Sequence, residues 1–312
     1  MTETLTFDSG GIRCVATLYR PMGVAEPVPC LVMGHGFTGT QDQLTPSAES
    51  FATAGLAVLT FDYRYFGKSG GQPRQVINTK KQLEDWRAAI SLARSLDGVD
   101  AQRVSLWGSS LSGGHVVKLA AEDPAIAAVV AQTPAFDKSI RRISREIKAK
   151  KEREGISLAS QILDYLRPLA AGTYDTFRGL LGLSPHYIAV FAKPGEAAAF
   201  TDPESYKHLE DATKTGPTWR NEFAPRFLFG MPKYLQGTAE RVHAPLLICV
   251  AELDTEADPE LAMDIALKAP QGELKTYAGR HFDVYSGPMF QAILRDQVAF
   301  LRNTVCAPTS PS

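Results

Sequence analysis

A serine lies between small residues at the point where an apolar run ends. The run at residues 104–107 (VSLW) leads into GSSLS at 108–112, and a helix-compatible stretch follows at 116–121. A strand, a sharp turn and a helix in this order form the elbow that presents the nucleophile in G-x-S-x-G enzymes, where small flanking residues let the helix pass close to the strand. The motif predicts Ser110 as a nucleophile, with Ser112 in the place of the last glycine. The alternative is a Ser/Gly-rich loop without chemistry.

Two later loops supply the base and the acid that a serine hydroxyl requires, because the hydroxyl alone is a poor nucleophile at neutral pH. Asp254 follows an apolar strand predicted at 246–250, and His281 follows another predicted at 273–277. Loops at the ends of parallel strands meet at one edge of a sheet. We predict that Ser110 attacks a carbonyl carbon, that His281 takes its proton and that Asp254 orients the imidazole.

Other residues of the same types have structural interpretations. Asp258 competes with Asp254, but its place before a predicted helix favours a capping role. Asp283 is interpreted as a group that supports the base or faces solvent. Ser109 and Ser112 are interpreted as packing or local hydrogen-bonding residues. The histidines set aside as candidate bases are His35, His115 and His243.

Backbone donors for a developing oxyanion are predicted in two places. One is the N–H of Leu111, at the start of the helix after the elbow, and the other is the N–H of Phe37, in a glycine-rich loop after the apolar run 30–33. Each such donor contributes about 3 kcal/mol to stabilisation of the transition state. The segment 62–64 (DYR) is interpreted as a hydrogen-bonded network that braces these loops, with substrate binding as the alternative. The residues expected to contact substrate are Tyr65, Phe66 and Trp219.

Apolar runs alternate with amphipathic segments, which predicts an α/β fold with a mostly parallel, eight-stranded sheet flanked by helices. The continuous apolar runs are typical of strands that are buried on both faces. Strands are predicted at 3–8, 12–20, 30–33, 56–61, 104–107, 126–131, 246–250 and 273–277. Helices are predicted from residue 45 and at 79–96, 116–121, 258–268 and 287–303.

The alternation breaks after residue 137. Residues 138–240 contain helix-like stretches and no clear strand, so we predict a helical cap inserted into a core formed by 1–137 and 241–306, with a disordered tail at 307–312. The basic run at 138–154 is interpreted as a solvated face, and the alternative is a site for an anionic group such as the phosphates of coenzyme A. The many aromatic residues of the cap would line an apolar acyl pocket or form the cap's own core.

Composition limits the possible partners and cofactors. The chain has 312 residues, 44% of them hydrophobic, and a net charge of −1, which gives no nucleic-acid footprint. It has no run long enough to span a membrane and no signal-peptide pattern, so we expect a cytoplasmic protein. Its four cysteines form no C-x-x-C pair, and we expect neither a metal nor another cofactor. The expected partner is a small-molecule acyl substrate, and the sequence is compatible with a homodimer.

Taken together, these motifs resemble the α/β-hydrolase superfamily. The matching pieces are GHGF at 34–37, FDYR at 61–64, the elbow, the Asp254 loop and RHFD at 280–283. The chain is most similar to dienelactone-hydrolase-like enzymes and to fungal polyketide transferases or thiohydrolases. The resemblance covers about 1–137 and 240–305 and includes a weaker similarity at 219–222 (WRNE).

This resemblance implies a serine hydrolase that cleaves a carboxylic ester, thioester or lactone through an acyl-enzyme, without a cofactor. One alternative is an acyltransferase, in which an alcohol or amine replaces water. Another is a ligand-binding module that has lost its activity, because a fold does not determine a function. Peptidase action has no specific support in the motifs.

Overall fold

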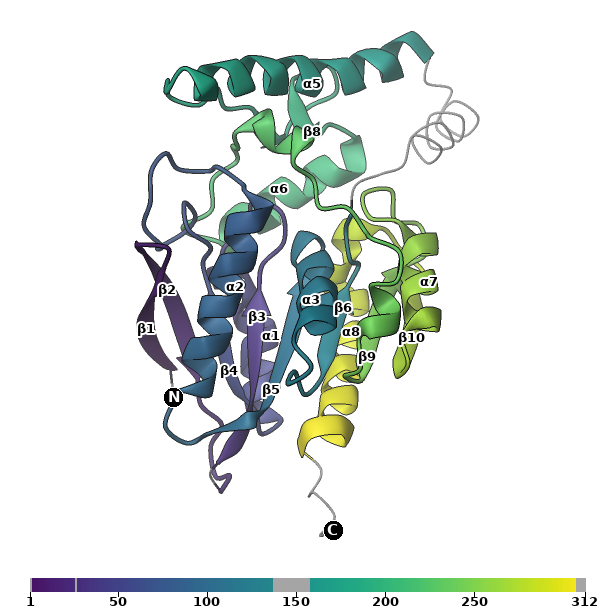
Figure 1. Ribbon diagram of the computed structural model, residues 1–312. Coiled ribbons are helices and arrows are strands. Elements are labelled where there is room, and N and C mark those ends of the chain that lie inside the picture. The colour runs from purple at the N-terminus through teal and green to yellow at the C-terminus, as the bar shows by residue number, and fades with distance from the viewer. Residues whose placement is uncertain (1, 26, 137–157, 307–312) are drawn as a thin grey trace.

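The computed structural model describes residues 2–25, 27–136 and 158–306. Its centre is an eight-stranded sheet in the order β1-β2-β4-β3-β5-β6-β9-β10. β1 and β2 pair antiparallel, as do β2 and β4, and the remaining pairs are parallel. The predicted fold class is therefore confirmed (Figure 1). The strands are β1 (Thr2–Ser9), β2 (Ile12–Tyr19), β3 (Val28–Gly34), β4 (Ala57–Phe61), β5 (Val99–Ser109), β6 (Val129–Gln132), β9 (Leu246–Ala251) and β10 (Gly272–Tyr277).

Helices cover both faces of this sheet and bury two apolar clusters. One cluster includes Trp86, Val116 and Ile265, so α2, α3 and α7 lie on the same face. The other includes Phe51 and Ile293, which come from α1 and α8. Because successive strand residues point to opposite faces, both clusters draw on the same fully buried strands. The helices are α1 (Thr45–Thr53), α2 (Thr79–Arg94), α3 (Leu111–Glu122), α7 (Pro259–Lys268) and α8 (Gly287–Leu301).

The described segment 158–229, between β6 and β9, lies above the sheet in Figure 1. It contains α5 (Leu158–Leu180), β7 (Ala189–Phe191), β8 (Ala198–Phe200), α6 (Pro203–Thr215) and the 3₁₀ turn η2 (Pro225–Phe229). The expectation of no strand here is wrong, because β7 and β8 form a short parallel pair. Strands of three residues are too short to produce a recognisable apolar alternation. The division into core and cap stays a prediction, and the basic run at 138–154 and the tail at 307–312 lie outside the described residues.

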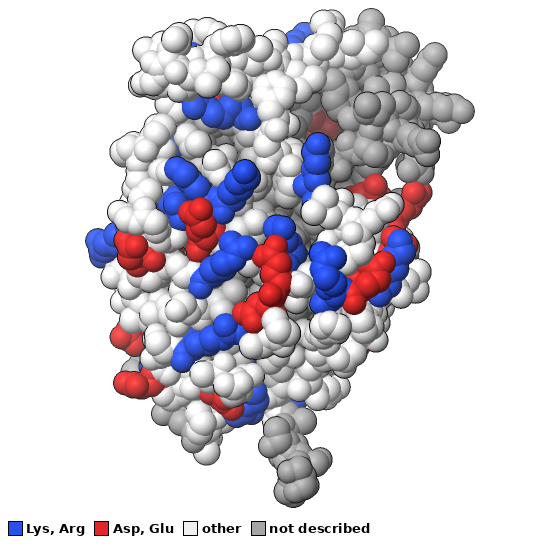
Figure 2. Space-filling model, viewed as in Figure 1, with Lys and Arg blue, Asp and Glu red and all other residues white. Residues whose placement is uncertain are grey.

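Charged side chains of both signs intermingle over α2 and α3 on the face shown in Figure 2. Arg87 pairs with Glu122 at 2.7 Å, and Arg94 pairs with Asp123 at 3.0 Å. The apolar residues of these helices face the sheet instead. Among residues 2–25, 27–136 and 158–306, no helix is both long enough and apolar enough to cross a membrane.

Candidate active site

Ser110 occupies the sharp turn between β5 and α3. Its φ of 54° and ψ of −118° lie outside the regions that residues with a side chain normally adopt. The turn is possible because Gly108 passes against the helix, where a Cβ would collide with the carbonyl group of Ser112. This strained corner directs the Ser110 hydroxyl away from the sheet, and the residue is 7% exposed.

The structure brings three predicted residues together. His281 Nε2 lies 3.0 Å from Ser110 Oγ, and His281 Nδ1 lies 2.6 Å from Asp254 Oδ2. A carboxylate can only accept, so Nδ1 carries the proton and Nε2 is left to accept from the serine hydroxyl. Backbone N–H groups of Glu256 and Ala257 donate to Asp254 Oδ1 at 2.7 and 2.8 Å, which holds the carboxylate in place. The catalytic roles of Ser110, His281 and Asp254 remain predictions.

The competing residues have other contacts. Asp258 Oδ1 accepts from the N–H of Leu261 at 3.3 Å at the start of α7, which is the geometry of a helix cap. Asp283 accepts from the N–H of Arg280 at 2.8 Å. His115 Nε2–H donates to Gln82 Oε1 at 3.0 Å, and burial lowers the pKa of His115 to about 3. The side chain of His243 is exposed.

The two predicted oxyanion donors lie on adjoining segments. Leu111 is the first residue of α3, where backbone N–H groups have no intrahelical acceptor. Phe37 follows Gly36, and a Cβ built on Gly36 would lie 3.2 Å from Ser110 Cβ. The loop after β3 therefore runs directly beside the elbow. Within the described residues, the N–H groups of Phe37 and Leu111 have no backbone acceptor.

A buried hydrogen-bonded series joins this loop to the elbow helix, and the sequence interpretation did not foresee that Ser112 bonds across to the loop. Trp86 Nε1–H donates to the Tyr63 hydroxyl at 2.6 Å, and the Tyr63 and Ser112 hydroxyls are hydrogen-bonded to each other. Ser112 Oγ donates in turn to the carbonyl oxygen of His35. Because an indole N–H can only donate, each hydroxyl in the series accepts from the previous residue and donates to the next, from Trp86 to the His35 carbonyl. The serine that replaces glycine in the elbow thus ties α3 to the loop after β3.

The segment 62–64 makes hydrogen bonds that brace the loops, as the first of its two interpretations predicts. The Asp62 carboxylate accepts from Gln41 N and Lys68 N at 2.8 and 2.9 Å. Arg64 Nε donates to Asp85 Oδ1 at 2.7 Å. These bonds fix the loops after β3 and β4 against α2.

The residues expected to contact substrate pack against other side chains. The Tyr65 hydroxyl accepts from Lys81 Nζ at 2.9 Å, and the buried Phe66 ring lies 6.2 Å from the His35 ring. The Trp219 ring lies 6.2 Å from that of Phe191. All of these contacts are with other side chains of the protein. The substrate role of the three residues stays a prediction.

Aromatic rings of the segment above the sheet rest on residues next to the candidate triad. The Phe37 ring lies 4.9 Å from Phe223 and 5.9 Å from Phe200. Phe282, which follows His281, lies 5.1 Å from Phe200 and 5.2 Å from Phe191. These five rings, called the aromatic wall below, therefore adjoin both the loop after β3 and His281. The sequence interpretation named Phe191 and Phe223 among the aromatic residues of the cap but did not name Phe200 or Phe282, and an acyl pocket lined by these rings stays a prediction.

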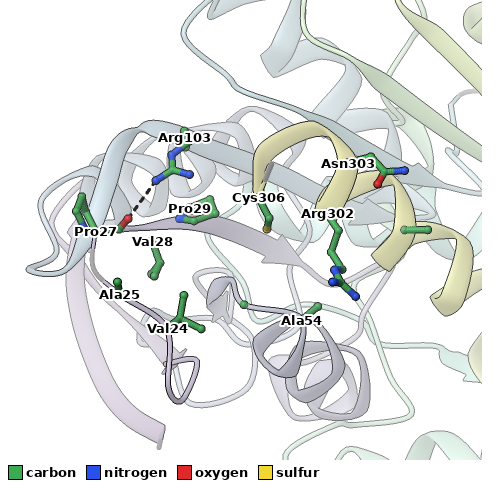
Figure 3. Close-up of a pocket in the computed structure, with 12 residues that line it drawn as sticks. Val24, Ala25, Pro27, Val28, Pro29, Ala54, Arg103, Arg302, Asn303 and Cys306 are labelled. Atoms are coloured by element: carbon green, nitrogen blue, oxygen red, sulfur yellow. Dashed lines mark hydrogen bonds between the residues drawn. The ribbon is translucent and has the colours of Figure 1, made fainter. Parts of the chain in front are cut away.

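A cavity of about 690 Å³ lies elsewhere (Figure 3). Val28 at the start of β3 lines it, together with Arg103, Arg302 and Cys306. β3 and β5 are parallel, so this cavity is at the opposite end of the strands from Ser110. Arg103, which lines this cavity, donates hydrogen bonds to the Pro27 carbonyl at 3.1 Å and to Asp100 at 2.7 Å.

Comparisons with known proteins agree with this fold. The profile of a family described as serine aminopeptidase, S33, matches residues 25–283. The quorum-quenching protein AidA of Acinetobacter baumannii (strain MDR-ZJ06) is 38% identical over 301 residues, which is 96% of this chain and 94% of that protein. Thiohydrolase aneE of Aspergillus aculeatus is 26% identical over 310 residues, covering 97% and 92%. The structure of α/β hydrolase GrgF from Penicillium sp. sh18 superposes with a TM-score of 0.75 at 20% identity, covering 98% and 99%.

Proposed function

The chain belongs to the serine aminopeptidase S33 family of α/β hydrolases, and we propose that it cleaves a carboxylic ester, thioester or lactone through an acyl-enzyme. The observation that carries this proposal is the hydrogen-bonded series from Ser110 through His281 to Asp254. The strained turn at Ser110 and two adjoining backbone donors add support.

The proposed reaction has two halves. Ser110 Oγ attacks the carbonyl carbon while its proton passes to His281 Nε2, and Asp254 stabilises the imidazolium that forms. The N–H groups of Phe37 and Leu111 bind the oxygen that becomes negative. The intermediate then collapses, His281 gives the proton to the leaving group, and water releases the acid by the same steps in the second half.

The aromatic wall supports an apolar acyl group as the substrate's larger part. Phe200 contacts both Phe37 and Phe282, so this wall reaches from the oxyanion loop to the base. Partly buried rings of this kind favour apolar ligands over charged ones. The name of aneE, a thiohydrolase, supports including thioesters among the candidate substrates.

Labelling with a fluorophosphonate probe tests the proposal, because the probe reacts with an activated serine. We expect labelling of the wild type and none of Ser110→Ala, with the matched control Ser50→Ala labelled like the wild type. Ser50 Oγ donates to the Pro46 carbonyl on the exposed surface of α1. A folded wild type that never reacts would contradict the proposal and favour the ligand-binding alternative.

Substrate class requires a second experiment. A panel of p-nitrophenyl esters of increasing acyl length, tested beside acyl-CoA thioesters and lactones, reports the size and polarity of the acyl pocket. Transfer to an alcohol or amine would use the same acyl-enzyme. Product analysis with and without such an acceptor distinguishes the acyltransferase alternative from hydrolysis.

A further inference from the structure

A second buried chain of hydrogen bonds runs from the core to the edge of the candidate site. Trp107 Nε1–H donates to Gln297 Oε1 at 2.9 Å, and Gln297 Nε2 donates to Gln132 Oε1 at 2.9 Å. Gln132 Nε2 donates to Ser109 Oγ at 3.1 Å, and Ser109 Oγ lies 2.9 Å from Tyr285 Oη. The first four side chains are at most 3% exposed, so solvent does not compete for these bonds.

The direction of this chain is fixed at its inner end, because an indole N–H can only donate. The Gln297 atom facing Trp107 is therefore the oxygen, and its amide nitrogen faces Gln132. Gln132 in turn presents its oxygen to Gln297 and its nitrogen to Ser109, whose oxygen accepts. Among the described residues, Tyr285 Oη is the acceptor left for the Ser109 proton. The Tyr285 proton consequently points away from Ser109.

The Tyr285 hydroxyl lies beside the nucleophile, although 42% of the residue is exposed. Tyr285 ends the 3₁₀ turn η4 (His281–Tyr285), and its ring is 6.3 Å from the His281 ring. A Cβ built on Gly36 would lie 3.7 Å from Tyr285 Oη and 3.2 Å from Ser110 Cβ. The side of Gly36 that lacks a side chain thus faces the space between the phenol and the nucleophile.

Tyr285 keeps its proton at neutral pH. Burial of the hydroxyl, with a smaller effect from the charge of Asp254, raises the pKa of Tyr285 to about 12, and neighbouring hydroxyls, that of Ser110 among them, limit this rise. A protonated phenol beside the reacting serine is a hydrogen-bond donor.

Resting on the serine-hydrolase function proposed above, we propose that Tyr285 is a further catalytic residue, whose hydroxyl donates a hydrogen bond to the substrate oxygen that becomes negative when Ser110 attacks. Ser109, Gln132, Gln297 and Trp107 act as positioning residues that turn the phenol proton toward that oxygen. A series of aligned hydrogen bonds also polarises its last donor, which strengthens the bond as the charge develops.

The step requires no proton from Tyr285. The bond between Ser110 Oγ and the carbonyl carbon forms, the π electron pair moves to the carbonyl oxygen, and the serine proton passes to His281. On collapse this pair re-forms the carbonyl, the bond to the leaving group breaks, and His281 protonates that group. The phenol bond is stronger to the charged oxygen than to the neutral carbonyl, so it stabilises the transition state selectively.

The first test compares Tyr285→Phe with wild type and Ser110→Ala on the p-nitrophenyl ester that the wild type hydrolyses fastest. We expect kcat to fall about 100-fold with KM little changed, as for loss of one oxyanion donor. Tm should fall modestly, because buried Ser109 loses the acceptor for its proton. Affinity for a trifluoromethyl ketone of the same acyl length should fall by a similar factor, because its adduct with serine carries the same negative oxygen.

Each other outcome overturns the inference. If Tyr285→Phe keeps its kcat while Ser110→Ala is inactive, the proposed function stands and Tyr285 is not catalytic. If only KM rises, the hydroxyl binds the ground state alone. If the wild type neither hydrolyses esters nor reacts with the fluorophosphonate, the proposed function fails and the role of Tyr285 fails with it.

A second variant tests the direction of the chain. In Gln132→Glu, a protonated carboxyl still donates to Ser109, whereas a carboxylate accepts from it and would turn the Tyr285 proton away from the site. We expect kcat near that of the wild type at low pH and a fall toward the Tyr285→Phe value as this carboxyl ionises. A pH profile with the wild-type shape, in a protein whose Tm is unchanged, would show that the chain does not set the phenol proton.

Discussion

Ser112 donates a hydrogen bond from its side chain to the carbonyl oxygen of His35, which joins the helix after the nucleophile to the loop that carries Phe37. Both residues are at most 2% exposed. The usual glycine of the motif could not make this bond. The substitution therefore adds a tether between the two segments that supply the proposed oxyanion donors.

Ser112→Ala is expected to reduce kcat about 10-fold with little change in KM. The variant leaves the His35 carbonyl without this donor and the Tyr63 proton without its acceptor, and an unsatisfied buried group costs about 1–3 kcal/mol. Ester kinetics together with urea unfolding measure the two effects. Ser50→Ala removes an exposed hydrogen bond to a carbonyl and should change neither. Equal kcat in Ser112→Ala and wild type would remove the tether from the mechanism.

Asp254→Asn and Asp258→Asn should behave differently, although the two positions are only four apart in the sequence. At position 254 an amide no longer fixes the His281 tautomer, and kcat should fall about 10⁴-fold, as it does when a triad acid is replaced. At position 258 asparagine can still cap α7, so activity and Tm should stay near wild type. Steady-state kinetics of both variants check the assignment, and loss of activity in Asp258→Asn alone would reverse it.

Buried His115 should make the protein less stable in mild acid. Burial lowers the pKa of His115 to about 3, from an ordinary value of about 6.5 in the unfolded chain. Between these two pH values His115 binds a proton in the unfolded state but not in the folded state. The free energy of unfolding therefore falls as the pH drops below about 6.5, by about 2 kcal/mol from pH 7.5 to pH 5.

His115→Gln should remove this part of the pH dependence while leaving kcat intact, because His115 bonds to Gln82 and not to the triad. Urea unfolding at pH 5 and pH 7.5 measures the difference. The exposed His243→Gln serves as the control and should keep the wild-type slope. If the free energy of unfolding of His115→Gln depends on pH as in the wild type, groups other than His115 cause that dependence.

The parts of the fold that could be predicted from sequence are those determined by residues close to one another along the chain. β3 and β9 are buried along their whole length, so their apolar runs are visible without knowledge of their neighbours. The elbow has the same advantage, because the steric demand at Gly108 comes from Ser112, four residues away. By contrast, β7 and β8 are stabilised by an aromatic cluster that includes Phe223. Their three-residue sequences alone do not specify a strand.

The missed features of the site depend on partners that are distant along the chain. Ser112 and His35 are 77 residues apart, and Ser109 and Tyr285 are 176 apart. A serine or tyrosine gives no indication in the sequence of which hydroxyl or carbonyl it meets after folding. Tyr65 shows the same dependence, because its place in a loop near the site suggested a substrate contact, which stays a prediction, but gave no sign that its hydroxyl bonds to Lys81 of α2.

Gly108→Ala should destabilise the protein strongly, whereas Gly230→Ala should not. A Cβ at position 108 would collide with the Ser112 carbonyl where strand and helix are both fixed by packing, so either the elbow opens or α3 moves. We expect a loss of at least about 3 kcal/mol, as for severe overpacking, together with loss of fluorophosphonate labelling. A Cβ at position 230 would meet its nearest atom, the Phe227 carbonyl oxygen, at an ordinary 3.6 Å, and φ there is −119°. Urea unfolding and probe labelling of both variants test this. A stable, fully labelled Gly108→Ala would mean that the elbow does not need close contact between β5 and α3.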